Sequence, residues 1–207
     1  MKKDIAASIG IVIFGIILLF FTTNGFTAFT MEQQRIQDLQ TQPPEFPDIE
    51  VVDQTGESFN FKDFEGKHVL MTFIYTSCAA ACPEMTTNMK YVYEKTDDKY
   101  FEEDLIFLSV SFDMERDTVE VLDRYAEYFN ADPASWKMLR VLDDNDLEIL
   151  LDTYGVTVIP EGDTDYQHNT SFYILNPEGQ LTEVLNFKEP DIAAEILTEH
   201  LEEQEEK

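Results

Sequence analysis

The only two cysteines of the chain, Cys78 and Cys82, lie in the stretch F-I-Y-T-S-C-A-A-A-C-P at residues 73–83. An apolar run precedes them and a helical pattern follows, which predicts that both sulfurs lie where a strand passes into a helix. The unpaired N–H groups and the dipole at the beginning of a helix favour the thiolate, the form of cysteine that attacks disulfides and binds metals. The pattern therefore predicts a reactive or metal-binding pair of thiols.

The spacing C-x-x-x-C leaves two kinds of chemistry open. Residues i and i+4 share one face of a helix, so the two sulfurs can converge on a single soft ion such as copper(I) or zinc. One added imidazole would give a three-ligand site that also suits copper(II). The same separation is compatible with a redox-active dithiol or a structural disulfide. Two cysteines cannot staple a domain of this size, which favours a functional pair over an architectural one.

A third metal ligand would come from one of three histidines, His68, His168 and His200. We expect His68 at the end of a central strand opposite Cys78, and His200 near the end of the last helix as a solvated or helix-capping residue. His168 follows a loop at residues 156–167 that we predict to be irregular, so it can project toward the cysteine turn. The residues alone leave open whether His168 binds a metal or is structural.

The elements that must position these side chains alternate along the chain. Apolar runs predict strands at residues 49–53, 58–61, 68–75, 105–112, 136–142, 171–175 and 181–187, and helices at residues 80–95, 119–129, 143–154 and 191–202. This order predicts an α/β sandwich with a mixed central sheet and an N-terminal hairpin. In such sheets ligands bind beyond the carboxyl ends of strands, where the cysteines are expected. Asp117 is predicted to cap a helix, and Met85 and Met89 to lie in the core.

The N-terminus reads as a membrane anchor. Lys2 and Lys3 precede an uncharged apolar run from Ile5 to Phe21, which is longer than the apolar part of a secretory signal. The two lysines would keep the N-terminus inside the cell, so we expect a single-pass protein of the cell membrane with its domain on the extracytoplasmic side. The predicted organisation is one transmembrane helix at residues 1–29, a stalk or linker at residues 30–46, and one domain at residues 47–207.

The charge of the chain excludes some partners. There are 42 acidic against 14 basic residues, and the formal net charge is -28. Such a chain would be repelled by phosphate backbones and by anionic membrane surfaces. We therefore expect no binding to nucleic acid.

Three separated motifs resemble the Sco/SenC family of copper-binding assembly factors of cytochrome c oxidase. They are T-S-C-A-A-A-C-P at residues 76–83, S-F-D-M-E-R-D-T at residues 111–118 and H-N-T-S-F-Y-I-L-N-P-E-G at residues 168–179. The resemblance covers about residues 46–201 and implies a thioredoxin-like fold. It also implies that Cys78, Cys82 and His168 bind copper, as Cu(I) or Cu(II), with Asp113 close to them. From the residues alone, Asp113 could equally pair with Arg116 at the strand end.

The family implies a membrane-anchored metallochaperone rather than an enzyme. Such a protein delivers copper to the copper-A subunit of cytochrome c oxidase, or reduces the cysteines of that subunit with Cys78 and Cys82 as a redox-active pair and a thiol-disulfide reductant as partner. The alternatives are a thioredoxin-like thiol-disulfide oxidoreductase or peroxide-reducing enzyme, and a sensor of copper or redox state. The chain departs from the family pattern at Ala79, Ala80 and Ala81, where a proline and an acid are common, and at Met114, where a proline is usual.

Overall fold

The structure, a computed structural model, describes residues 2–22, 30–78, 81–101, 103–162 and 165–205. Its centre is a mixed sheet with the strand order β2-β1-β5-β4-β3-β8-β9. Strands β3, β4 and β5 run parallel, and β1, β8 and β9 join antiparallel to their neighbours. The strands are β1 (Glu50–Asp53), β2 (Ser58–Asn60), β3 (His68–Ile74), β4 (Leu105–Ser111), β5 (Trp136–Val141), β8 (Phe172–Leu175) and β9 (Leu181–Leu185).

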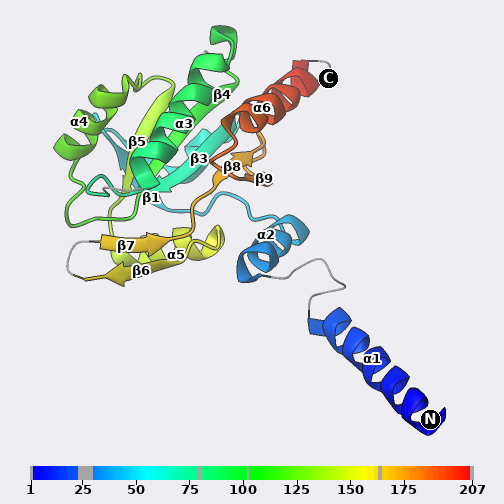
Figure 1. Cartoon of the computed structure of the whole chain (residues 1–207). Helices are drawn as coiled ribbons and strands as arrows, with labels where there is room; N and C mark the ends of the chain where they lie inside the picture. Colours follow the sequence, from blue (N-terminus) through cyan, green and yellow to red (C-terminus); the bar gives the residue numbers. More distant parts are fainter. Residues whose placement is uncertain (1, 23–29, 79–80, 102, 163–164, 206–207) are drawn as a thin grey trace.

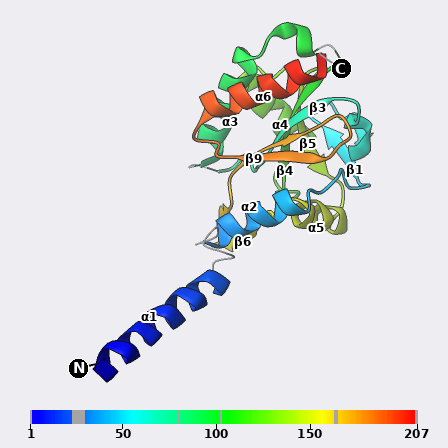
Figure 2. The same cartoon turned by 90° about the vertical axis from the view of Figure 1, so that its right-hand side faces the viewer.

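Helices cover both faces of this sheet. Figures 1 and 2 show α3 (Ala81–Lys95) and α6 (Pro190–Glu205) over one face, where α4 (Val119–Phe129) also packs. Helices α2 (Met31–Thr41) and α5 (Asp144–Thr153) lie on the other side. Two short 3-10 helices complete the domain, η1 (Phe61–Phe64) and η2 (Asp98–Phe101).

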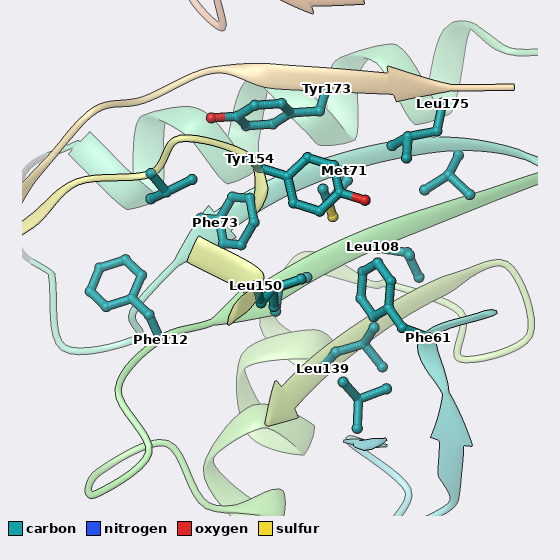
Figure 3. Packing of buried hydrophobic residues seen from close by; sticks show 14 of the residues in the cluster. Phe61, Met71, Phe73, Leu108, Phe112, Leu139, Leu150, Tyr154, Tyr173 and Leu175 are labelled. Carbon is teal, nitrogen blue, oxygen red and sulfur yellow. The ribbon is translucent and has the colours of Figure 1, made fainter. Parts of the chain in front are cut away.

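The period of two in a strand divides the core into two layers. Met71 and Phe73 of β3 point to the side of α5, whereas Leu70 and Ile74 point to the side of α3 and α6. Figure 3 shows the first layer, in which Phe73 packs with the rings of Tyr154 and Tyr173. Both β3 and β4 are buried along their whole length. Burial on both faces explains why these strands read as continuous apolar runs in the sequence.

Several sequence predictions are confirmed here. The sheet is mixed, and β1 and β2 form the predicted N-terminal hairpin. Met85 and Met89 of α3 are fully buried, which agrees with the predicted core role. The hydroxyls of Thr72 and Ser109 lie 3.1 and 3.5 Å from the two thioether sulfurs.

The loop prediction for residues 156–167 is wrong. This segment contains β6 (Val158–Glu161), which pairs antiparallel with β7 (Asp165–His168) as a separate two-stranded sheet. Its sequence lacks the apolar alternation of a half-buried strand, and its burial is shallow. The hairpin is instead held by tertiary packing, since the ring of Tyr166 stacks edge-on against Tyr75 and Phe112.

The segment at residues 30–46, predicted to be a stalk, packs on the domain. Thr30 caps α2 by accepting a hydrogen bond from the backbone N–H of Gln33, and Leu39 is buried in the core. The guanidinium of Arg35 donates to the backbone oxygen of Tyr154 and to the hydroxyls of Tyr173 and Ser171, each at 3.2 Å. At least α2 is therefore part of the folded unit rather than a spacer.

The predicted transmembrane helix receives no support from the structure. Residues 2–22 form α1, and its described side chains, such as Ile11 and Phe14, are exposed. Within the part of the chain that the structure describes, no helix meets the combined length and apolar character needed to cross a membrane. Residues 1 and 23–29 of the predicted anchor lie outside the described residues.

Candidate metal centre

The cysteines follow the carboxyl end of β3, as the sequence predicts. Cys78 closes the turn after the strand, and Cys82 lies in the first turn of α3, where Pro83 is tolerated. Neither is in a disulfide, and 9% and 1% of their surface is exposed. The backbone N–H of Cys82 donates to the sulfur of Cys78 at 3.3 Å. A helix N–H directed at sulfur favours the thiolate of Cys78.

His168 reaches this turn from the end of β7. Its Nε2 lies 3.7 Å from the sulfur of Cys82, although 86 residues separate the two in the chain. Its Nδ1 lies 3.1 Å from the backbone oxygen of Asn169. A carbonyl oxygen can only accept, so Nδ1 carries the proton of the neutral ring and Nε2 presents its lone pair to the sulfur. Hydrogen bonding of this kind typically orients a metal-binding histidine.

The distance between Nε2 and the sulfur fits a shared metal ion. Bonds of about 2.3 Å to sulfur and about 2.0 Å to nitrogen, at an angle of roughly 110–120°, place the two ligand atoms about 3.5–3.7 Å apart. The donor set of two thiols and one imidazole suits copper. Within the described residues, no group of three or more His, Cys, Asp and Glu side chains is already arranged to hold a metal ion. The contact between Cys82 and His168 thus brings two of these three donors together.

An aromatic wall surrounds the imidazole. The ring of His168 packs edge-on against Tyr75 and Phe112, with centroids 6.0 and 5.0 Å apart. Burial lowers the pKa of His168 and raises the pKa of the Cys82 thiol. Burial is also the main reason that the pKa of Tyr75 rises to about 12. The site therefore favours uncharged ligands, so binding of a metal cation would expel the proton of Cys82.

The resemblance implies that Asp113 lies near the metal. In the structure its carboxylate is paired with an arginine. Its carboxylate pairs with the Nε of Arg116 and accepts the backbone N–H of that residue at 3.3 Å. The guanidinium of Arg116 in turn lies over the ring of Tyr166, 5.3 Å from its centroid. Asp113 thus connects the end of β4 with the hairpin that carries His168. Ala79 and Ala80 lie outside the described residues.

Asp117, near this site, has a different role from the helix cap that the sequence predicts. The residue that precedes α4 as its cap is Thr118, so the prediction of a cap at Asp117 is wrong. The Asp117 carboxylate is fully buried and accepts hydrogen bonds from the backbone N–H and hydroxyl of Thr76, at 3.0 and 2.5 Å, and from the hydroxyl of Ser111 at 2.5 Å. The signal in the sequence was a pair of hydroxyl residues at the ends of two buried strands.

The other two histidines lie away from the cysteines. His68 begins β3 and packs beside His200 of α6, with ring centroids 6.1 Å apart. The sequence expectation that His68 stands at the end of the strand opposite Cys78 is confirmed. Of the three histidines, His168 is the one placed against a cysteine sulfur.

A mixed sheet between two helical layers, with a pair of thiols at the start of the helix that follows a central strand, defines a thioredoxin-like dithiol domain. Residues 37–203 match the SCO1/SenC family model, and the chain belongs to this family. The resemblance recognised from the three motifs is therefore confirmed.

Relatives and solved structures agree with this assignment. The chain is 27% identical over 135 residues to the SCO1 protein homolog of Bacillus subtilis, covering 64% of this chain and 69% of the relative. It is 30% identical over 151 residues to the human protein SCO1 homolog, mitochondrial, covering 70% of this chain and 49% of that protein. The structure of Bradyrhizobium japonicum ScoI with copper bound superposes with a TM-score of 0.62 at 26% identity, covering 76% of this chain and 97% of the other.

The buried carboxylate of Asp117 yields a test of loop stability. In Asp117→Asn, the amide NH₂ faces the N–H and hydroxyl groups that donate to the carboxylate, so donor meets donor. The free energy that keeps the turn before Cys78 closed should fall by about 1–2 kcal/mol, and the turn should open about 5- to 30-fold more often. The rate at which a maleimide modifies the two thiols should rise by a similar factor. Asp123→Asn, an exposed change on α4, is the matched control. Equal rates in the two variants would contradict the role of Asp117.

Proposed function

We propose that this chain binds copper through Cys78, Cys82 and His168 and acts in the assembly of the copper-A site of cytochrome c oxidase. Homologues in the SCO1/SenC family take part in copper delivery and in assembly of this oxidase. The observation that carries the proposal for this chain is the Nε2 lone pair of His168 directed at the sulfur of Cys82 at 3.7 Å. Copper is the cargo of such a protein rather than a resident cofactor.

Delivery by ligand exchange is the first form of this function. Thiolates of the acceptor would bind copper while Cys78 and Cys82 release it, so that each new bond replaces an old one and no bare ion appears. Soft thiolates hold copper(I) well, and the added imidazole also accommodates copper(II). Cys78 retains more exposure than Cys82, so the acceptor would first reach the sulfur of Cys78.

Thiol reduction is the second form. The thiolate of Cys78 would attack a disulfide of the acceptor, forming a mixed disulfide and releasing one acceptor thiolate. Cys82 would then attack the sulfur of Cys78, which releases the second acceptor thiol and leaves a Cys78–Cys82 disulfide. Two electrons pass to the acceptor in this sequence, so a separate dithiol reductant must restore the pair. The helix N–H at Cys78 and the buried state of Cys82 support this order of attack.

The ligand assignment can be tested by copper(I) titration of the reduced protein against a competing chelator. We expect one copper(I) per chain, and His168→Ala should weaken binding at least about tenfold because one of three ligands is lost. Cys82→Ser should weaken it further. His200→Gln changes a histidine at the other end of the domain and serves as the control. Unchanged affinity in His168→Ala would remove His168 from the site.

The cellular role can be tested in a strain that lacks the gene. We expect lower oxidase activity and lower copper-A content, restored by the normal chain but not by Cys78→Ser. Recovery on added copper supports delivery, whereas recovery only on an added thiol reductant supports disulfide reduction. Normal oxidase in the deletion strain would contradict both forms and favour a sensor of copper or redox state.

We further propose that residues 1–29 hold the chain at the cell membrane with the domain on the extracytoplasmic side. The support is the apolar run after Lys2 and Lys3 and the exposure of the apolar side chains of α1, such as Ile11 at 72%. The chain should sediment with membranes, and protease added outside intact cells should digest the domain. Recovery of the full chain in the soluble fraction, or protection from external protease, would contradict this placement.

A further inference from the structure

A polar cavity lies at the end of the sheet opposite the cysteines. It has a volume of about 280 Å³, and its lining includes His68, Glu178, His200, Glu203 and Gln204. It is formed by the start of β3, the turn between β8 and β9, and the C-terminal part of α6. Figures 1 and 2 place that end of α6, marked C, far from the hairpin β6–β7 that carries His168.

The cavity contains a buried histidine with unused ring nitrogens. His68 is 4% exposed, and neither Nδ1 nor Nε2 has a hydrogen-bond partner. Its backbone N–H donates to the oxygen of Asp104 at 2.7 Å. The side chain of Gln204 faces the ring and partly offsets the lowering of the pKa of His68 by burial, but it does not reach hydrogen-bonding geometry with either nitrogen. A buried polar group without a partner costs about 1–3 kcal/mol, so a folded protein seldom retains one without a reason. A metal ion bound to the lone pair of a ring nitrogen would remove this cost.

A second imidazole stands beside the first. His200 is half-buried on α6, and its ring centroid lies 6.1 Å from that of His68. A nitrogen bound at about 2.0–2.1 Å puts a ring centroid roughly 3.1 Å from a metal ion, so two rings on one ion lie up to about 6.2 Å apart. The observed separation is at the upper end of this range, and a small rotation of His200 would bring the rings closer.

The charges around the cavity favour a cation. Glu178 and Glu203 line it, and among the residues that the structure describes no Lys or Arg does. Their carboxylates would repel an anionic ligand and balance the charge of a divalent ion. Burial lowers the pKa of His68, which keeps its ring neutral and able to bind metal.

We propose that His68 and His200 form a second metal site, in which two imidazoles bind a divalent transition-metal ion of the Cu²⁺, Ni²⁺ or Zn²⁺ class. Water completes the coordination, and Glu178 and Glu203 balance the charge from the cavity wall. Imidazole binds all three ions well, whereas Mg²⁺ and Ca²⁺ prefer oxygen ligands and would be excluded. The site has two protein ligands, so it binds its ion more weakly than a three-ligand site and exchanges it with solvent.

The test uses the full chain in detergent with Cys78→Ser and Cys82→Ser, which removes the thiol ligands of the first site. Ni²⁺ is the probe because it suits imidazole and leaves the redox state unchanged. Calorimetry should give one Ni²⁺ per chain, and His200→Gln should weaken binding at least about tenfold. Glu199→Gln removes a charge from the neighbouring exposed position and is the matched control, expected to bind Ni²⁺ as before.

A second measurement locates the ion. Bound Ni²⁺ should broaden the ring resonances of His68 and His200 in NMR spectra and leave those of His168 sharp. Broadening of His168 alone would place the ion at the first site and overturn the proposal. So would the absence of Ni²⁺ binding, or equal affinity in His200→Gln and Glu199→Gln. His200 is only half-buried, so its exchange for glutamine should leave the fold intact, which circular dichroism checks.

Discussion

One buried carboxylate, that of Asp117, controls the geometry at the carboxyl edge of the sheet. A charge with no exposure to water must be compensated by hydrogen bonds. Asp117 obtains them from Thr76, just after β3, and from Ser111, the last residue of the adjacent parallel strand β4. The turn that begins at Thr76 leads directly into Cys78. The position of the thiols is therefore fixed by an acceptor that belongs to neither β3 nor α3, and the loop cannot move without exposing an unpaired charge.

The candidate metal centre combines rigid placement with a poorly hydrated environment. Tyr75 and Phe112 form the wall against which His168 rests, and the Asn169 carbonyl fixes the proton on the far side of its ring. Burial stabilises the neutral forms of the Cys82 thiol and the His168 imidazole. Such a site differs from an exposed redox thiol, because water and large oxidants reach the sulfur of Cys82 poorly. A soft metal cation that replaces the thiol proton would compensate the negative charge of the buried thiolate.

The two ends of the sheet hold histidines in different ways. At one end, His168 has an internal hydrogen bond and a thiol neighbour, and at the other, His68 is buried without a partner for either ring nitrogen. The strand β3 connects them, with His68 at its first residue and the cysteine turn after its last. Strand geometry of about 3.3 Å per residue separates the two ends by roughly 20 Å, too far for one ion to be shared. The two ends of the sheet are therefore chemically distinct environments.

The sequence by itself determined the strands of the central mixed sheet with the helices between them, the place of Cys78 and Cys82, and the family. These depend on local periodicity, turn residues and contiguous motifs. The motifs already singled out His168, but only the tertiary structure shows its ring against a thiol. Only the tertiary structure decided that Asp117 is a buried acceptor rather than a helix cap and that residues 158–168 form a hairpin. Those outcomes arise from contacts such as the one across 86 residues between Cys82 and His168. No local pattern encodes a contact of this kind, since its energy is gained only when separate elements pack together.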